Sequence, residues 1–424
     1  MDGSLEAIRN LSWRTGYVSI PLENTFDASF TPRLLTTLTS QVHVQEEFKV
    51  EQAAREIPVL KIQTVDGKPL PGGTVPSIKS SKKNITIQVA IEKNLSLVEE
   101  VRLFQNTKLV GTVNTLEDIK PVLTFEASLT DAFGPENFFY VTAKSKQGFD
   151  AEKSRFSVVY EGKTEEKARL FILTIGINEY RNPKYNLNYA VADATSFETA
   201  MKNGSQKLFD PPVIKSIRNS KATKAGILSA FHEIQQQAKE QDLFVFYYAG
   251  HGVMSEGKQI EAQFYLVPHD ITQLYGHDEM LQEKGISAAE LKELSKNINA
   301  QKQVFILDAC QSSGALESVA LRGAEEEKAM AQLARSTGTF WITAAGSEQF
   351  ATEFADLGHG VFTYSLIEGL GGKADNGDKK ITVKELSAFI ENRVPELSEK
   401  YKGKPQFPSG YSFGNDFPLV LVEK

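Results

Sequence analysis

The hydrophobic pattern of the chain changes its period between residues 162 and 169, and this change most constrains the fold. Before it, apolar and polar residues alternate in short runs that are separated by turn-forming pairs such as Asp66-Gly67. After it, apolar residues come in continuous runs with helical patterns between them. Alternation is typical of strands with one solvated face, whereas continuous runs are typical of strands buried on both faces. The sequence therefore predicts two different architectures in one chain.

The alternating runs predict a β-sandwich over residues 56–162, which we interpret as immunoglobulin-like because short strands follow one another with no long helix between them. The expected strands cover residues 59–65, 84–92, 99–106, 123–129, 137–145 and 154–161. Residues 1–55 form an N-terminal extension without an assigned fold, apart from a candidate helix over residues 45–55.

The continuous runs predict a mostly parallel sheet flanked by helices, an α/β domain over residues 167–424. The apolar runs cover residues 170–175, 243–248, 304–307 and 339–343. Helical patterns cover residues 190–201 and 223–239, and two more helices are expected to begin with capping boxes at residues 287–290 and 382–385. A charged stretch, residues 162–169, links the two domains.

Charge and composition exclude several classes of protein. The 424 residues include 47 Lys and Arg against 54 Asp and Glu, a formal net charge of −7, which gives no general attraction to nucleic acid. No apolar run reaches the roughly 18 residues of a membrane span, and the N-terminus lacks a secretory signal pattern, so we expect a cytoplasmic protein without a membrane partner. The single cysteine, Cys310, excludes an internal disulfide and a Cys-rich zinc site.

Two of the buried runs end in residues that could carry chemistry. Residues 243–248 lead into Gly250-His251-Gly252, and residues 304–307 lead into Asp308-Ala309-Cys310. Functional groups in open α/β sheets gather beyond the carboxyl ends of the strands. A cysteine after an apolar strand is more often a small buried side chain, but a histidine at an equivalent strand end could activate the thiol.

The neighbours of the candidate histidine also bear on this interpretation. The flanking glycines would let the backbone approach a substrate, and the N–H of Gly252 could serve an oxyanion hole. The other histidines are interpreted as surface or capping residues: His43, His232, His269, His277 and His359.

These segments carry a family resemblance. YYAGHG (247–252) and LDACQSSG (307–314) resemble the histidine and cysteine motifs of the caspase-like cysteine peptidases, especially the metacaspase and bacterial caspase-homologue branch. The resemblance covers about residues 168–424. It implies that Cys310 is the nucleophile, that His251 is the general base and acid, and that the N–H groups of Gly252 and Cys310 hold the oxyanion. Gln311 and Ala249 depart from the metacaspase pattern, which usually has His and often Ser there.

The resemblance also implies a substrate preference. Metacaspases place one Asp two residues before the cysteine and another in the helix after the first strand, and Asp308 and Asp193 occupy these positions. Two carboxylates lining one pocket would favour Arg or Lys before the scissile bond, since a desolvated charge needs an opposite partner. The alternative for Asp193 is a solvated carboxylate on a helix face.

A calcium site is a weaker interpretation of residues 374–385. Asn376, Asp378 and Glu385 have ligand-like spacing, but the first position is Ala and the sixth is Lys, so a turn followed by a helix cap is favoured. Asp270 and Asp278 are a second candidate with a poor match to the calcium-binding cluster of some metacaspases. We therefore predict no metal and no other cofactor.

The segment after the candidate nucleophile, residues 316–337, is charged and rich in Ala. It is expected to be either a loosely packed processing loop, cut after Arg322, Lys328 or Arg335, or a stable surface helix. The sequence as a whole predicts a latent cysteine endopeptidase that acts on proteins or peptides, with an activating protease or a regulator as partner at the sandwich. The alternatives are another acyl-transfer enzyme with the same residue pair, and a caspase-fold scaffold without catalysis.

Overall fold

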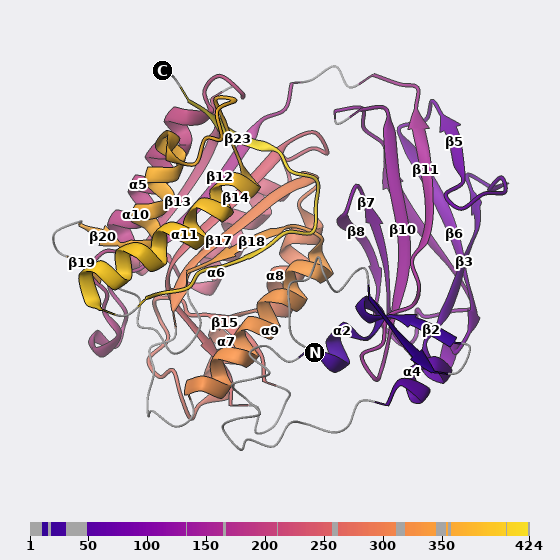
Figure 1. The fold of residues 1–424 in the computed structure, drawn as a ribbon, viewed down its shortest axis with the longest axis horizontal. Helices are drawn as coiled ribbons and strands as arrows, with labels where there is room; N and C mark the ends of the chain where they lie inside the picture. Colours follow the sequence, from indigo (N-terminus) through magenta and orange to yellow (C-terminus); the bar gives the residue numbers. More distant parts are fainter. Residues whose placement is uncertain are drawn as a thin grey trace. The chain divides into compact units, whose positions relative to one another are not determined.

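The fold is described from a computed structural model of the chain (Figure 1). The structure describes residues 11–15, 18–30, 49–132, 134–163, 167–209, 211–256, 262–310, 319–344, 353–354, 358–403 and 405–422. The chain divides into two compact units, Met1–Glu165 and Glu166–Lys424.

The first unit is built around two β-sheets whose inner faces form one core. One sheet has the strand order β4–β3–β6–β9, and the other has the order β5–β11–β10–β7–β8. The strands are β3 (Val59–Val65), β4 (Lys68–Pro69), β5 (Ser77–Ser80), β6 (Asn84–Lys93), β7 (Val98–Gln105), β8 (Lys108–Val113), β9 (Val122–Ser128), β10 (Glu136–Ser145) and β11 (Ser154–Tyr160), and a short η2 helix (Leu95–Leu97) precedes β7. The predicted β-sandwich is confirmed, and its immunoglobulin-like character stays a prediction that this strand order supports.

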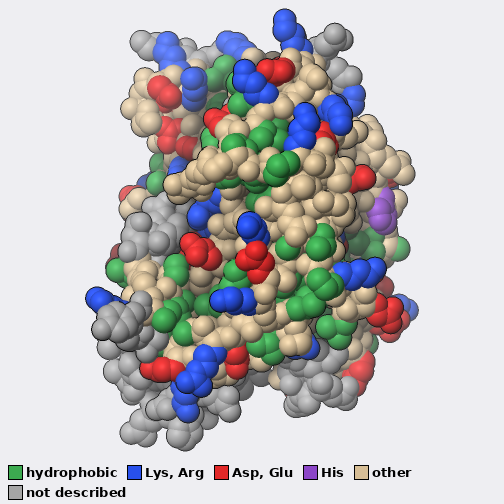
Figure 2. Space-filling model, turned by 90° about the vertical axis from the view of Figure 1, so that its right-hand side faces the viewer, with side chains coloured by type: hydrophobic (Ala, Val, Ile, Leu, Met, Phe, Trp, Pro, Cys, Tyr) green, Lys and Arg blue, Asp and Glu red, His purple; other side chains and the backbone are tan. Residues whose placement is uncertain are grey.

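Alternation along these strands separates the core from the solvated surface. Ile85, Ile87 and Val89 of β6 are buried and pack with Phe156 and Val158 of β11 in the core of this unit. In β6 the positions between Ile85, Ile87 and Val89 are exposed or half-buried, and in β9 the positions between Leu123, Phe125 and Ala127 are exposed. On the face presented in Figure 2, side chains of both charges are dispersed among apolar ones. The period of two in the sequence therefore reflects one buried and one solvated face.

The N-terminal residues belong structurally to this first unit. They form β1 (Ser12–Thr15), β2 (Val18–Pro21), η1 (Leu22–Thr25), α2 (Phe26–Ser29) and α4 (Val50–Glu56). Ile20 and Ala53 pack with Phe149 of the sandwich in a small apolar cluster. An ion pair of 2.7 Å joins Glu23 to Lys153. The candidate helix over residues 45–55 is observed as α4, and residues 45–48 lie outside the described part of the chain.

The second unit contains a central sheet with the order β13–β12–β14–β17–β18–β22. All neighbouring strands along this path are parallel except the pair β18–β22. The strands are β12 (Leu170–Gly176), β13 (Val213–Arg218), β14 (Leu243–Met254), β17 (Lys302–Cys310), β18 (Phe340–Thr343) and β22 (Ser409–Tyr411). Smaller strands are β15 (Phe264–Leu266), β16 (Ile286–Ser287), β19 (Glu353–Phe354), β20 (His359–Gly360), β21 (Lys380–Thr382) and β23 (Pro418–Leu421).

Helices cover both faces of this sheet. They are α5 (Ala190–Ser205), α6 (Lys224–Gln235), α7 (Asp278–Lys284), α8 (Ala288–Asn297), α9 (Val319–Thr337), α10 (Val361–Glu368) and α11 (Val383–Lys402), with short helices η3 (Pro183–Tyr185), η4 (Asn219–Lys221) and η5 (Gly369–Lys373). On one face, Phe197 of α5 stacks on Tyr247 at 4.5 Å between ring centroids. On the other, Phe231 of α6 packs against Phe246 at 5.3 Å. The predicted α/β domain is confirmed, and in Figure 1 α5, α10 and α11 lie together beside the sheet.

The two capping boxes form as the sequence predicts. In α8, the Ser287 hydroxyl accepts from the backbone N–H of Glu290, whose carboxylate accepts from the Ser287 N–H. Thr382 and Glu385 make the same pair of bonds at α11. Each box satisfies two backbone donors that a helix start leaves without partners. None of the helices in the described residues is both long and apolar enough to cross a membrane.

Of the two expectations for the segment after the candidate nucleophile, a loose loop or a stable helix, the described part forms the helix. From Val319 onward it forms α9, and Met330, Leu333 and Ala334 of this helix are buried. Lys328 and Arg335 therefore lie in helical backbone with a packed face, and the expectation of little core packing is wrong there. The side chain of Arg322 lies outside the described part of the chain. Cutting at the three sites stays a proposal.

Candidate active site

The register between two central strands brings the candidate dyad together. In the parallel pair β14–β17, His251 is the direct partner of Cys310, and Ala249 is the partner of Asp308. Neighbouring strands lie about 4.8 Å apart, so the backbone places the two residues side by side. Cys310 is the last residue of β17, and its side chain lies outside the described part of the chain. The two strand ends that the sequence singles out therefore meet at one edge of the sheet.

His251 is held in one orientation by two tyrosines. Its side chain is buried, and Nε2 lies 2.7 Å from the backbone carbonyl oxygen of Tyr185. The Tyr180 hydroxyl accepts from the backbone N–H of His251 at 2.9 Å, and the two rings lie 4.9 Å apart. A carbonyl oxygen can only accept, so Nε2 carries the hydrogen and Nδ1 is the basic nitrogen of the neutral ring. The tautomer thus leaves Nδ1 as the atom that takes a proton.

The loop that supplies both tyrosines is built by asparagine side chains. The side-chain oxygen of Asn186 accepts from the Tyr180 N–H at 2.8 Å. The Asn178 side chain accepts from the backbone N–H of Val191 and donates to the backbone carbonyl oxygen of Asn188. These bonds replace the backbone partners that an irregular loop lacks. No pattern in the sequence pointed to a role for Tyr180 or Tyr185. The run of four asparagines between residues 178 and 188 was the available signal that this loop is ordered.

The glycines around His251 have a packing explanation. A Cβ at Gly250 would lie 2.7 Å from the Tyr248 hydroxyl and 2.8 Å from the Tyr180 hydroxyl. A Cβ at Gly252 would lie 2.7 Å from the Phe264 ring. Atoms this close would clash, so both positions need glycine because of their neighbours within the domain. Close packing therefore explains why glycine occurs at both positions, without the expected approach of the backbone to a substrate.

The two aspartates expected in the substrate pocket converge on one point. Asp193 of α5 is 4% exposed and accepts from the backbone N–H of Gly360, while Asp308 of β17 accepts from the Thr363 hydroxyl at 2.6 Å. A Cβ at Gly360 would lie 3.3 Å from Asp193 Oδ2 and 3.5 Å from Asp308 Oδ2. The two carboxylates therefore flank the same residue. The alternative of a solvated Asp193 on a helix face is wrong because this side chain is buried.

A buried tyrosine completes the hydrogen-bond chain to Asp308. Thr363 uses its one hydroxyl hydrogen on Asp308, so the Tyr247 hydroxyl donates to Thr363 across 2.5 Å. Burial, together with the charges of Asp308 and Asp193, raises the pKa of Tyr247 well above its usual range. Tyr247 therefore stays neutral, and it acts as a donor throughout the physiological pH range.

His359 contacts a candidate site residue, which the sequence did not lead us to expect. Its Nδ1 lies 2.8 Å from Asp193 Oδ1, and its side chain is only partly exposed, so it is more than the surface or capping residue that the sequence suggested. His359 and Gly360 form β20, which leads into α10, and α10 carries Thr363. One short segment therefore contacts both carboxylates. Its place within residues 168–424, the range that the family resemblance covers, was the signal that the sequence offered.

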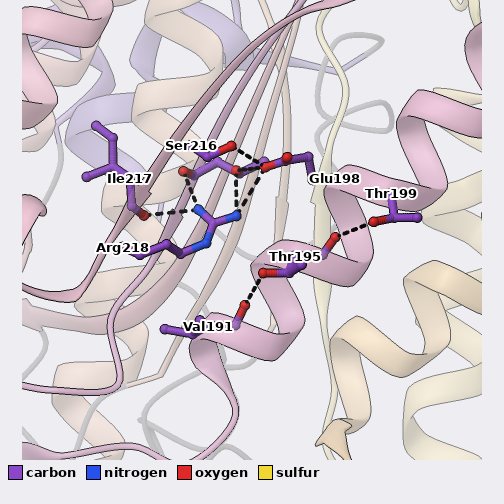
Figure 3. A network of polar contacts seen from close by, with 8 residues as sticks. Val191, Thr195, Glu198, Thr199, Ser216, Ile217 and Arg218 are labelled. Atoms are coloured by element: carbon purple, nitrogen blue, oxygen red, sulfur yellow. Dashed lines mark hydrogen bonds and ion pairs between the residues drawn. The ribbon is translucent and has the colours of Figure 1, made fainter.

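An ion pair holds α5, and with it Asp193, against the sheet (Figure 3). Glu198 accepts from Thr174 of β12 at 2.7 Å and from Ser216 of β13 at 2.6 Å. Arg218 donates to Glu198 at 3.1 Å and to the Thr174 carbonyl oxygen at 2.8 Å. The guanidinium is thus engaged by Glu198 and the strand backbone. These contacts fix the helix five residues beyond Asp193.

Three of the calcium candidates accept hydrogen bonds from backbone groups. Asp378 accepts from the Lys380 N–H at 2.9 Å, and Glu385 serves the cap of α11. Asp278 accepts from the Glu256 N–H at 3.0 Å, and Asp270 lies 3.9 Å from Lys284 Nζ. Within the described ranges, no group of three or more His, Cys, Asp and Glu side chains is placed to hold a metal ion. The geometry at residues 374–385 is that of a turn followed by a helix cap.

Comparison with protein families shows that residues 169–413, more than half of the chain, match the family described as "Caspase domain". A search of curated proteins found no match. Among solved structures, the chain is similar to protein GSU0716 from Geobacter sulfurreducens at 17% identity and a TM-score of 0.42, over 60% of this chain and 100% of that one. It is also similar to the fibronectin(III)-like modules of Clostridium thermocellum CbhA at 7% identity and a TM-score of 0.18, over 25% of this chain and 100% of that one. By the family match, the chain belongs to the caspase-domain family of cysteine peptidases.

Proposed function

We propose that this chain is a cysteine endopeptidase that cleaves after Arg or Lys, with Cys310 as nucleophile and His251 as general base and acid. The observation that carries the proposal is the register that pairs His251 with Cys310 at the carboxyl ends of β14 and β17. The hydrogen bond from Nε2 to Tyr185 supports it, because it makes Nδ1 the proton acceptor. A residue pair of this kind is the usual way to activate a thiol.

The reaction follows from these roles. His251 takes the thiol proton, and the sulfur of Cys310 attacks the carbonyl carbon of the scissile bond. The backbone N–H groups of Gly252 and Cys310 would hold the oxyanion. The C–N bond then breaks, and His251 returns the proton to the leaving amine. Water attacks the thioester while His251 takes its proton, which releases the carboxylic acid and the thiol.

The carboxylate pair supports the preference for a basic side chain. Asp193 and Asp308 meet beside Gly360, and Asp308 lies two positions before Cys310 in the same strand. The guanidinium of Arg218, which would suit an acidic substrate side chain, is already paired with Glu198. An Arg or Lys side chain would therefore find opposite charge, whereas an aspartate would meet repulsion. The pair also favours the metacaspase branch of the family.

Covalent labelling tests the proposal. A peptide fluoromethyl ketone with Arg before the reactive group should label the wild-type chain at Cys310, as read by peptide mass spectrometry. The matched ketone with Asp should label it far more slowly, and Cys310→Ala should take up neither reagent. Labelling at another residue, or equal labelling by the Asp reagent, would contradict the dyad or the specificity respectively.

Latency is part of the proposal because an endopeptidase of this preference would find many substrates in a cell. Release from the latent state would come from cutting after Arg322, Lys328 or Arg335, by the protein itself or by an activating protease, or from a regulator bound at the β-sandwich. The buried face of α9 argues that cutting there requires local unfolding first. Mass spectrometry of wild type stored beside Cys310→Ala tests self-cutting, since only the wild type should yield fragments.

A further inference from the structure

We propose that His359 sets the charge of the substrate pocket, so that preference for Arg or Lys falls when His359 is protonated. This inference rests on the proposed peptidase function, and it adds a residue through which pH controls specificity. His359 does not contact the scissile bond in this scheme. It acts through Asp193, as a positioning and charge-setting residue.

The contact between His359 and Asp193 is direct. Nδ1 of His359 lies 2.8 Å from Asp193 Oδ1, and a carboxylate can only accept, so Nδ1 carries a hydrogen. The ring is therefore either the neutral Nδ1–H tautomer or the imidazolium. The His359 side chain is 20% exposed and that of Asp193 is 6% exposed. Solvent can thus deliver a proton to the histidine while its partner stays buried.

Within the described residues, the titratable groups around this pair come from three elements: Asp193 lies on α5, Asp308 on β17 and Tyr247 on β14. The backbone of Gly360 also pairs with Glu353 of β19, whose side chain lies outside the described part of the chain. The more distant Glu198 and Arg218 neutralise each other. Burial, followed by the two carboxylate charges, raises the pKa of Tyr247, which keeps it neutral. Among these residue types, histidine is the one whose charge ordinarily changes between about pH 5 and pH 8.

Protonation would change the charge that a substrate side chain meets. With neutral His359, the pocket presents two carboxylates that accept hydrogen bonds from uncharged donors, Gly360 and Thr363. With the imidazolium, Asp193 has a cation at hydrogen-bond distance, and the pair is close to neutral. A substrate guanidinium would then interact with one net negative charge instead of two and would also meet a like charge nearby. Its binding should weaken, whereas an uncharged side chain of the same shape should be little affected.

The test compares two substrates that differ only in charge. The ratio of kcat/KM for an Arg peptide to that for the matched citrulline peptide is measured from pH 8 to pH 5.5. Titration of the dyad cancels in this ratio because both substrates use it. We expect the wild-type ratio to fall at least about tenfold, which corresponds to about 1.4 kcal/mol. In His359→Asn, whose amide can still donate to Asp193 but does not titrate, the ratio should stay flat.

The outcomes separate this inference from the proposed function. A wild-type ratio near one at every pH would contradict the Arg/Lys specificity itself. A ratio well above one whose pH dependence survives in His359→Asn would overturn the role of His359 and leave the peptidase proposal intact.

A second measurement uses the wild-type chain alone and therefore covers a variant that fails to fold. The His359 imidazole is titrated by NMR in the adducts with the Arg ketone and with its citrulline analogue. By linkage, the Arg adduct should move the titration midpoint to lower pH than the citrulline adduct does. Equal midpoints would overturn the inference.

Discussion

Two residues from different strands form the candidate dyad, and their positions predict how their mutants behave. We expect Cys310→Ala and His251→Ala each to lower kcat/KM for an Arg substrate by at least about 10³-fold, with the double mutant little worse, since dyad members act as a unit. Initial rates of substrate cleavage are measured for the parent enzyme, whose active concentration is set by active-site titration, and for each mutant. Circular dichroism checks that the mutants fold. Additive losses in the double mutant would show that the two residues act independently.

Asp308 allows a prediction about specificity at the same scale. In Asp308→Ala the preference for an Arg peptide over an Asp peptide should fall by about 2–5 kcal/mol, the range for removing one partner of a buried charge pair. The ratio of the two kcat/KM values measures this preference. An unchanged ratio would show that Asp308 does not face the substrate side chain.

Thr363 tests the buried hydrogen-bond chain between Tyr247 and Asp308. Thr363→Val keeps the shape but removes the hydroxyl, which leaves the Tyr247 hydroxyl without its partner and should destabilise folding by about 1–3 kcal/mol. Thr363→Ser keeps the hydroxyl and is the matched control, with a smaller loss. Urea unfolding midpoints measure both variants. Equal stability of Thr363→Val and wild type would contradict the hydrogen-bond chain.

At the scale of elements, α9 decides how readily the segment after the nucleophile can be cut. Lys328 and Arg335 lie in this helix, whose residues Ala331 and Ala334 are fully buried. A protease needs an extended backbone, so cutting after these residues requires α9 to unwind locally.

Digestion by added trypsin measures how well α9 protects these sites, in a Cys310→Ala protein that cannot cut itself. Ala331→Gly should speed cutting after Lys328 and Arg335 by about fivefold, because glycine weakens a helix interior by about 1 kcal/mol. Gln332→Ala is the control and should not speed it. Fragment mass spectrometry gives the rates. Rapid cutting of the parent protein at both sites would show that α9 does not protect them.

At the scale of the whole molecule, the second unit has a core of its own. The cluster around Tyr247, Ile306 and Leu386 is drawn from residues 170–420 alone. The strands of the dyad and both pocket carboxylates also lie within Glu166–Lys424.

A chain cut to residues 166–424 should therefore fold and should still react with the Arg ketone at Cys310. Cooperative thermal unfolding and labelling stoichiometry are the measurements. If the fragment folded without labelling while the full chain labelled, the first unit would be required for the competence of the site.

The sequence by itself determined the elements and the edge of the sheet where chemistry gathers. Burial of a strand on one or both faces produces a characteristic hydrophobic periodicity in the local sequence. The alternating runs therefore predicted the bounds of the core strands of the sandwich to within about two residues. The continuous runs predicted the strands β12, β14, β17 and β18. Capping boxes are local as well, which is why the starts of α8 and α11 were predicted. The short strands β5, β8 and β13 were not expected, because their partly exposed positions leave a weak pattern.

Only the tertiary structure decided how the site is completed. The carbonyl oxygen of Tyr185 lies 66 positions from His251, and His359 lies 166 positions from Asp193. Such contacts depend on how loops and helices pack over the ends of the strands, and they produce no hydrophobic periodicity in the sequence. The same holds for α9, whose buried face is set by the neighbouring elements it packs against. Burial of each element can be read from its local hydrophobic pattern, whereas contacts between side chains that are distant in the sequence form only when the elements pack together.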